Sequence, residues 1–197
     1  VRADLPRFNG LLFKQRDVPA LTAEQRDLLA EAARRNWREV EPAIFGTLIE
    51  RALDKDERHN LGAHFTPRAY VERLVSPAVL EPLRNEWAGV RGAVARLDET
   101  AEGATKPADR KKAAGEAVQL LAEFQRRLAT LRILDPACGS GNFLYVTFAG
   151  LKALEGEVRQ ALLRRGQPEI LELPGVAVHP SQMRGIEVNA RAASIAD

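Results

Sequence analysis

The sequence predicts an α/β fold in which two short strands of a parallel sheet are each followed by a helix, after a mainly helical N-terminal region. A short apolar run that ends in Asp135 is followed by a glycine-rich turn and by a helical pattern that begins at Asn142. A second strand fits residues 183–188, with Glu187 near its end. A strand, a glycine-rich turn and a helix N-terminus form a cradle for a ligand with anionic groups, because the backbone can approach closely and the helix dipole favours negative charge.

The N-terminal region is predicted to be helical after an irregular start. Residues 1–20 carry several proline and glycine breakers. Thr22 and Gln25 have the spacing of a capping box, which predicts a helix that starts at this point. A second helix fits residues 42–53, where proline lies in the first turn and apolar residues recur on one face.

A third helix is predicted at Thr66-Pro67, because threonine is a favourable N-cap and proline is favoured at the first helical position. Pro77 is expected to end or kink this helix, since proline lacks the N–H that a helix interior needs. A further helical stretch is predicted to continue to about Trp87.

The rest of the chain alternates between helical patterns and stretches that we interpret as insertions. Residues 89–112 are rich in alanine, glycine and charge, and we expect a loose insertion in which helix resumes near Pro107. Apolar residues recur with a helical period over 113–131, and another helix fits 142–155 and could continue over 159–163. Residues 156–182 contain several prolines and glycines and are interpreted as a second insertion.

The composition is that of an ordinary globular protein. The chain has 197 residues, a formal net charge of +2 and 45% hydrophobic residues. The single cysteine, Cys138, excludes an internal disulfide and suits a reducing cytoplasm, which we expect to be the location. No apolar run is long enough to span a membrane, and the three histidines and one cysteine show no metal-site spacing.

The glycine-rich turn could belong to more than one class of ligand-binding fold. The dinucleotide-binding fingerprint has a third glycine three residues after the second, where this chain has Leu144. Residues 135–144 read Asp-Pro-Ala-Cys-Gly-Ser-Gly-Asn-Phe-Leu. This string resembles the S-adenosylmethionine-binding motif of amino-methylating DNA methyltransferases of the N6-adenine branch. The resemblance implies that the cofactor is bound by Asp135, Pro136, Ala137, Gly139, Gly141 and Asn142.

Two further motifs extend this resemblance to other parts of the chain. A carboxylate at the end of the second strand can accept hydrogen bonds from both ribose hydroxyls, which predicts this role for Glu187. The gap between the turn and this acid exceeds the usual ~20 residues, in line with the insertion over 156–182. His64-Phe65-Thr66-Pro67 resembles the N-terminal cofactor motif of the same enzymes. It implies that Thr66 contacts the methionine carboxylate while Phe65 and Pro67 shape the pocket.

Segments near residues 8–13, 37–51 and 61–66 are similar to the large bifunctional restriction–modification methyltransferases of type IIL or IIG and to related phage-defence methyltransferases. The resemblance implies a class I methyltransferase core of Rossmann-like architecture, present in part over 61–197 and preceded by a helical connector over 1–60. It further implies double-stranded DNA as the partner of the complete protein, adenine N6 as the methyl acceptor, and an association with nuclease or other defence subunits.

The sequence lacks the catalytic loop of this family. The Asn/Asp-Pro-Pro-Tyr/Phe string that engages the target amino group does not occur, so no catalytic residue is predicted and the chain alone is expected to be inactive. Two alternatives stay open. The methyl acceptor could be protein glutamine or RNA, because cofactor motifs do not report on the acceptor, or the chain could be a truncated, non-catalytic remnant.

Overall fold

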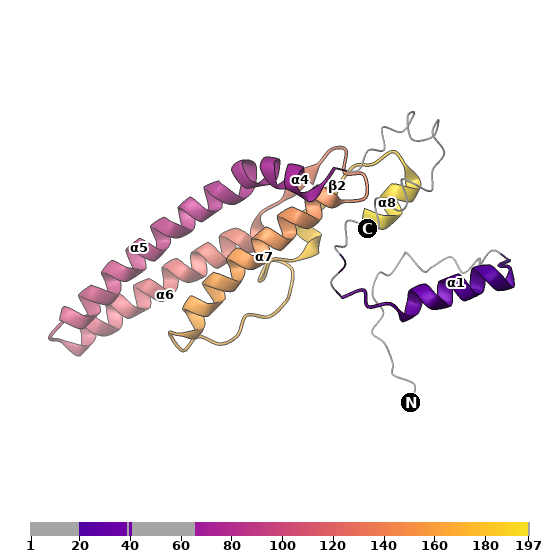
Figure 1. Cartoon of the computed structure of the whole chain (residues 1–197). Coiled ribbons are helices and arrows are strands. Elements are labelled where there is room, and N and C mark those ends of the chain that lie inside the picture. Colours follow the sequence, from indigo (N-terminus) through magenta and orange to yellow (C-terminus); the bar gives the residue numbers. More distant parts are fainter. Residues whose placement is uncertain (1–19, 39, 41–65, 197) are drawn as a thin grey trace. The chain divides into compact units, whose positions relative to one another are not determined.

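The computed structural model describes residues 20–38, 40 and 66–196. The chain divides into two compact units, which are treated separately below. The larger unit comprises Thr66–Cys138 and Asn142–Ile186, and the smaller one comprises Val1–Phe65, Gly139–Gly141 and Glu187–Asp197. Figure 1 shows that most of the larger unit is helical.

The first described helix, α1 (Ala23–Arg34), belongs to the smaller unit and has the predicted capping box. The Thr22 hydroxyl accepts a hydrogen bond from the Gln25 N–H at 3.2 Å, and the Gln25 side chain accepts one from the Thr22 N–H at 3.0 Å. None of the residues of α1 is buried. The helix predicted over 42–53 lies outside the described residues.

In the larger unit, helix α4 (Arg68–Val75) begins slightly later than predicted. Pro67 occupies the N-cap position, where its carbonyl accepts from the N–H groups of Tyr70 and Val71, and no side chain caps the helix. The prediction of Thr66 as the N-cap with Pro67 in the first turn is therefore wrong by one residue.

Pro77 is accommodated in a short π-helical turn, η1 (Ser76–Leu80), that leads from α4 into the next helix. In this turn the N–H of Glu81 donates to the carbonyl of Ser76. The widened hydrogen bond makes room for a ring that would clash in a regular helix, and such turns are a known cause of kinks. Figure 1 shows the chain changing direction between α4 and α5, so the predicted kink is confirmed.

Helices α5 (Glu81–Gly103) and α6 (Pro107–Thr130) form a long antiparallel hairpin. The expectations of a loose segment from residue 89 and of a helix that ends near Trp87 are wrong, because α5 continues to Gly103. The expectation that helix resumes near Pro107 is confirmed, since α6 begins there. Packing explains the difference: Trp87 of α5 stacks on Phe124 of α6, with ring centroids 5.3 Å apart. Tertiary packing of this kind outweighs the helix cost of Gly89 and Gly92.

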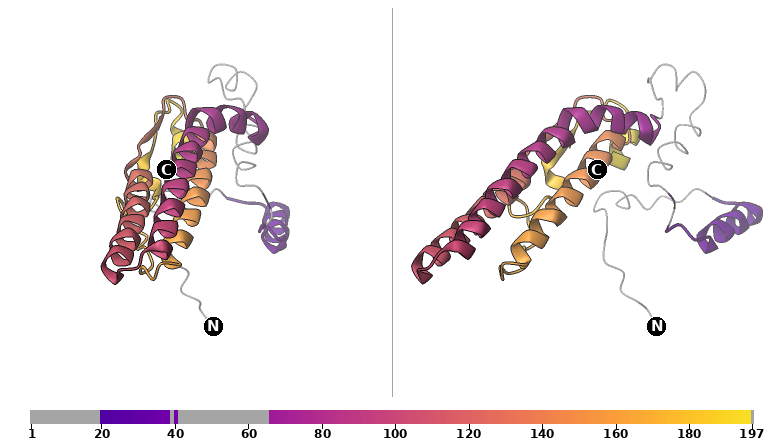
Figure 2. Two further views of the ribbon diagram at one scale, coloured as in Figure 1. Left: turned by 90° about the vertical axis from the view of Figure 1, so that its left-hand side faces the viewer. Right: turned by 60° about the vertical axis from the view of Figure 1, so that its left-hand side comes forward.

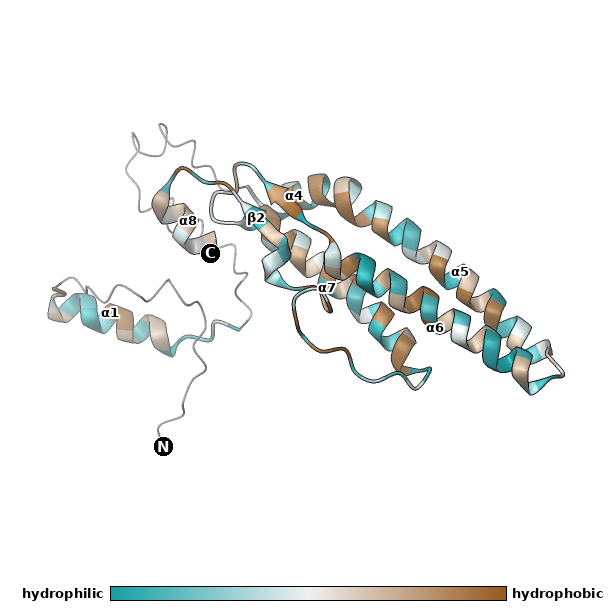
Figure 3. Ribbon diagram, turned by 180° about the vertical axis from the view of Figure 1, so that it is seen from behind, coloured by the Kyte–Doolittle hydropathy of each residue, from teal (hydrophilic) through white to brown (hydrophobic). Residues whose placement is uncertain are grey.

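Helix α7 (Asn142–Leu163) is the third long helix and continues past Glu155. Figure 2 shows α5, α6 and α7 side by side, and a single hydrophobic cluster draws its buried residues from all three. Leu151, Leu154 and Val158 of α7 are almost completely buried in it. Figure 3 shows hydrophobic and hydrophilic stretches alternating along α5 and α6, as expected for helices with one buried face.

Strands β1 (Ile133–Asp135) and β2 (Met183–Gly185) form a parallel pair, with Ile133 opposite Met183. The pairing continues beyond the strands, where the Ile186 N–H donates to the Asp135 carbonyl at 2.9 Å. Both predicted strands are confirmed, although β2 is shorter than the predicted 183–188. In the described part of the chain the sheet has these two strands only, so the predicted α/β core is present in part.

The buried side chain of Gln182 ties the start of β2 to the end of α6. Gln182 lies in a short 3₁₀ turn, η2 (Pro180–Gln182), and its amide donates to the carbonyls of Leu128 and Leu131, at 2.8 Å each. Its carbonyl oxygen accepts from the His179 N–H at 2.7 Å. One side chain thus satisfies three backbone groups. Its bonds hold the start of β2 next to the end of α6, which leads into β1.

The loop between α7 and η2 is held by a buried carboxylate. Glu155 of α7 is fully buried and accepts from the backbone N–H of Val178 at 2.7 Å. The Gln125 amide and the Lys152 ammonium also donate to it, at 2.6 and 2.7 Å. A buried charge is tolerated only when it is paired in this way, so Glu155 anchors the loop to α6 and α7.

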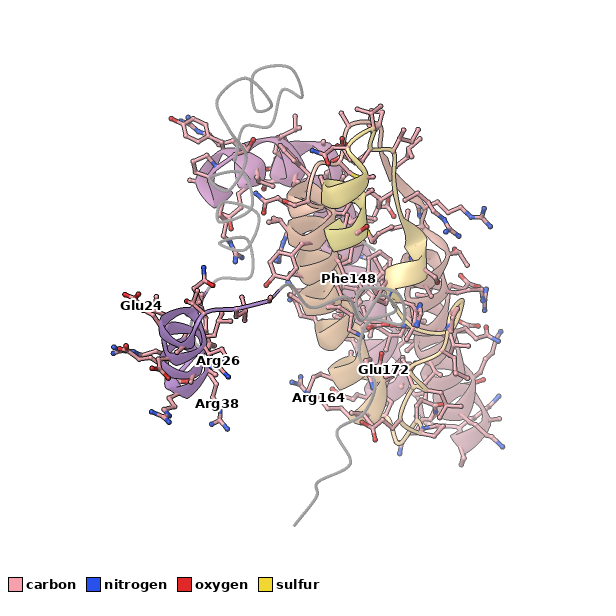
Figure 4. The ribbon with its side chains drawn as sticks, turned by 90° about the vertical axis from the view of Figure 1, so that its right-hand side faces the viewer. Glu24, Arg26, Arg38, Phe148, Arg164 and Glu172 are labelled. Carbon is pink, nitrogen blue, oxygen red and sulfur yellow. The ribbon has the colours of Figure 1, made fainter. Side chains whose placement is uncertain are left out.

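A second, exposed carboxylate secures the middle of the same loop. Glu172, labelled in Figure 4, pairs with Lys152 at 2.9 Å and with Arg159. Hydrogen bonds from Lys152 and Arg159 lower the pKa of Glu172 below its ordinary value of 4.5. Burial lowers the pKa of Lys152, but its bonds to Glu155 and Glu172 outweigh this effect and raise the pKa above 10.5.

We expect the loop to become less protected as the pH falls below the ordinary range of a glutamate. A carboxyl whose pKa is lower in the folded state stabilises that state above its unfolded pKa and loses this contribution as it becomes protonated. Hydrogen–deuterium exchange of peptides spanning 166–178, corrected for intrinsic exchange rates, should rise between pH 6 and acidic pH more steeply in the wild type than in Glu172→Gln. Equal pH dependence in the two proteins would contradict the assignment.

Candidate functional site

Asp135 closes the first part of the glycine-rich turn. Its carboxylate accepts a hydrogen bond from the N–H of Ala137 at 3.0 Å, as short acidic side chains do when they stabilise a turn two residues ahead. The Cys138 N–H donates to the Ile186 carbonyl at 3.0 Å, which joins the turn to the chain that follows β2. Pro136 and Ala137 are exposed.

Cys138 is a packing residue at the end of this part of the turn. It is buried and packs against Gly185. A Cβ at Gly185 would overlap the sulfur of Cys138 and crowd Leu144 of α7. The absence of a side chain at Gly185 therefore lets the turn pack directly on β2.

The two glycines of the turn both have left-handed backbone conformations. Gly139 has a φ of 55° and Gly141 a φ of 85°, and L-residues adopt such values only at a cost. An ideal Cβ at Gly139 has no atom of the described residues within 4 Å, so among these residues the position faces open space. A Cβ at Gly141 would lie 3.3 Å from the side chain of Ala196 in α8 (Ala190–Ala196), so this glycine also allows close packing.

Glu187 braces the same turn in the smaller unit. One carboxylate oxygen accepts from the N–H of Gly139 and the other from the N–H of Asn189, each at 2.8 Å. Sequence reasoning predicted a ribose contact for Glu187 and missed its bond to Gly139, because no local pattern reports a contact between residues so far apart. A carboxylate has about four acceptor positions, so two remain for a ligand's hydroxyl groups.

Asn142, the first residue of α7, contacts the other predicted cofactor motif. Its amide donates to the carbonyl of Thr66 at 2.7 Å, which brings together residues 76 positions apart. Pro67 is exposed and Phe65 lies outside the described residues. The helix that follows β2 is α8, and Asn189 caps it by accepting from the Ala192 N–H at 3.3 Å.

The described residues offer neither a metal-binding cluster nor a membrane-spanning helix. In the described ranges no group of three or more histidine, cysteine, aspartate or glutamate side chains could hold a metal ion. No helix among these residues is long and apolar enough to cross a membrane.

Comparisons with known proteins point to one kind of enzyme. Residues 109–197 match the family model described as MmeI, DNA-methyltransferase domain. The chain is 27% identical to DNA methyltransferase A of Bacillus subtilis (strain 168) over 98% of its length. It is 26% identical, over 98% of its length, to a putative type II restriction enzyme and methyltransferase of Methanocaldococcus jannaschii.

A solved structure agrees with these relatives. MmeI, a type IIL restriction–modification enzyme determined in complex with DNA, matches 97% of the chain with a TM-score of 0.70 and 32% sequence identity. The chain spans about a fifth of each protein: 19% and 18% of the two relatives and 22% of the MmeI chain. The comparisons therefore confirm the resemblance to restriction–modification DNA methyltransferases that the motifs indicated.

Proposed function

We propose that this chain forms the cofactor-binding part of a restriction–modification DNA methyltransferase that uses S-adenosylmethionine to methylate the N6 amino group of adenine. The observation that carries the proposal is the glycine turn after β1. Its two left-handed glycines and open space at Gly139 allow a ligand to approach the backbone, and a strand-end acid braces it. The similarity to DNA methyltransferases over nearly the whole chain supports the choice of cofactor.

The residues present suit the chemical groups of this cofactor. Glu187 retains acceptor positions for the two ribose hydroxyls. Asp135, Pro136, Ala137, Gly139 and Gly141 form the turn that contacts the cofactor, and Asn142 follows this turn as the first residue of α7. Phe65, Thr66 and Pro67 hold the methionine end. When bound, S-adenosylmethionine supplies an activated methyl group. We assign this chain the tasks of binding and orienting the cofactor, because it lacks the loop that engages the target amino group.

The full-length protein allows a direct test of both the cofactor and the acceptor. Calorimetric titration should detect binding of S-adenosylmethionine. Methyl-labelled cofactor should then transfer label to double-stranded DNA, and mass spectrometry of the digested DNA should find N6-methyladenine. Label transferred only to RNA or to protein glutamine would establish one of the alternative acceptors. Binding without transfer to any acceptor would favour a non-catalytic remnant.

Replacing Glu187 with alanine is expected to weaken cofactor binding by one to two orders of magnitude. The change removes the acceptor for the ribose hydroxyls and leaves the N–H groups of Gly139 and Asn189 without their carboxylate partner. Loss of a charged hydrogen-bond partner costs about 1.5–3 kcal/mol, or about ten- to a hundred-fold in affinity. Titration of the full-length variant measures the effect. Glu169→Ala, which removes an exposed carboxylate in the larger unit, is the control and should bind normally.

A further inference from the structure

The side chain of Asn142 occupies a helix start but does not cap that helix. Its amide nitrogen donates to the carbonyl of Thr66. Its carbonyl oxygen is buried and has no hydrogen-bond partner among the described residues. An asparagine that stabilised the start of α7 would instead accept from a backbone N–H of the first turn. The side chain is thus committed to the segment before α4, and its buried oxygen is left unpaired as a consequence.

The Asn142–Thr66 bond is placed where a small hydrophobic cluster already joins α4 to the first turns of α7. Val71 and Val75 of α4 and Val146 of α7 are buried together, and Phe143 and Leu80 pack against them. This cluster docks the body of α4. The hydrogen bond adds a polar link at Thr66, just before the helix.

We propose that Asn142 is a positioning residue, which holds the Thr66-Pro67 segment against the start of α7 so that this segment can bind the amino-acid end of the cofactor. The inference rests on the proposed function and deepens it, because it assigns the residue an indirect role for one end of the ligand. The adenosine end is bound by the glycine turn and Glu187, so its binding does not depend on the bond to Thr66.

This division of roles predicts a selective effect of Asn142→Ala in the full-length protein. The affinity for S-adenosylhomocysteine should fall about ten-fold or more, as expected when a buried hydrogen bond that orders a binding segment is lost. The affinity for 5′-methylthioadenosine, which lacks the amino-acid end, should change less than about two-fold. Competition titrations with these two probes measure the difference. Asn142→Asp should show the same selectivity, because its carboxylate cannot donate to the Thr66 carbonyl. The negative charge at the N-terminus of α7 stabilises the helix, so this variant is expected to remain folded.

Hydrogen–deuterium exchange without cofactor separates positioning from direct contact. The N–H groups of Tyr70 and Val71 donate to the Pro67 carbonyl in the first turn of α4. They should exchange faster in Asn142→Ala, because the segment before the helix has lost its anchor. Val146→Ala is the matched control, since it weakens the cluster between α4 and α7 and leaves the amide in place. It should retain the ratio of the two ligand affinities.

Each result has a distinct meaning. If the wild-type protein binds neither probe, the proposed function fails and the inference fails with it. If the wild type binds both and Asn142→Ala weakens both equally or neither, the cofactor site stands and the positioning role is wrong. Selectivity in Asn142→Asp alone would reveal repulsion by the new charge and would also overturn the inference. Unchanged exchange at Tyr70 and Val71 would do the same.

Discussion

Replacing Gly139 with valine is expected to abolish binding of S-adenosylmethionine to the full-length protein. Gly139 has a φ of 55°, and a β-branched residue is strained at this value. The new side chain would also project into the open space beside the turn, which is where we propose that the cofactor lies. We expect a loss of at least a hundred-fold, about 2.7 kcal/mol or more. Calorimetric titration measures it, and far-ultraviolet circular dichroism should remain close to that of the wild type.

A second glycine provides the control for backbone strain. Gly166 lies in the turn after α7 with a φ of 71°, and its ideal Cβ also has no atom of the described residues within 4 Å. Gly166→Val therefore imposes a similar conformational cost at a helix end, where the N–H of Gly166 bonds to the Leu163 carbonyl. It should bind the cofactor normally. Gly141 is a weaker test, because a side chain there would also crowd Ala196.

The comparison of the two variants decides between explanations. Normal affinity in Gly139→Val would mean that the turn serves only the fold. Loss of binding in both variants would mean that strain anywhere in the chain is enough to disrupt the site. Loss in Gly139→Val alone is the outcome that the turn geometry predicts.

Local patterns predicted those elements whose causes are local. The capping box at Thr22, the helical period over 113–131 and the apolar run of β1 each depend on neighbouring residues, and each is confirmed. The part of α5 after Trp87 could not be predicted, because it contains glycines that lower its intrinsic helix propensity. It is stabilised by packing on α6, and such tertiary contacts do not show in the local sequence pattern.

The candidate site shows the same division between local and long-range causes. The motif at 135–142 identified the turn, and its glycines have the backbone conformation that such a turn needs. The bonds from Gly139 to Glu187 and from Asn142 to Thr66 join residues 48 and 76 positions apart. Such contacts follow from the packing of α4, α7 and the strands, so residue spacing alone gave no signal for them.

The 197-residue chain, expressed alone, is expected to transfer no methyl group to DNA. Its sequence contains no Asn/Asp-Pro-Pro-Tyr/Phe string, so it offers no matching residue to hold the adenine amino group while the base is stacked and oriented. The measurement is transfer of tritium from labelled S-adenosylmethionine to double-stranded DNA, with the full-length protein as the positive control. Turnover by the isolated chain would show that other residues can engage the acceptor.

The isolated chain is also expected to lack a sharp, cooperative thermal transition. A parallel sheet is stable when its strands are paired and both of its faces are covered. The described sheet has two strands, and Leu134 and Ile186 are 61% and 54% exposed beside it. Exposed strand edges and apolar side chains favour self-association over a single folded state. A thermal melt combined with light scattering tests this expectation. A sharp melt of a monomer would show that the three-helix cluster of α5, α6 and α7 is sufficient to fold the chain without further sheet partners.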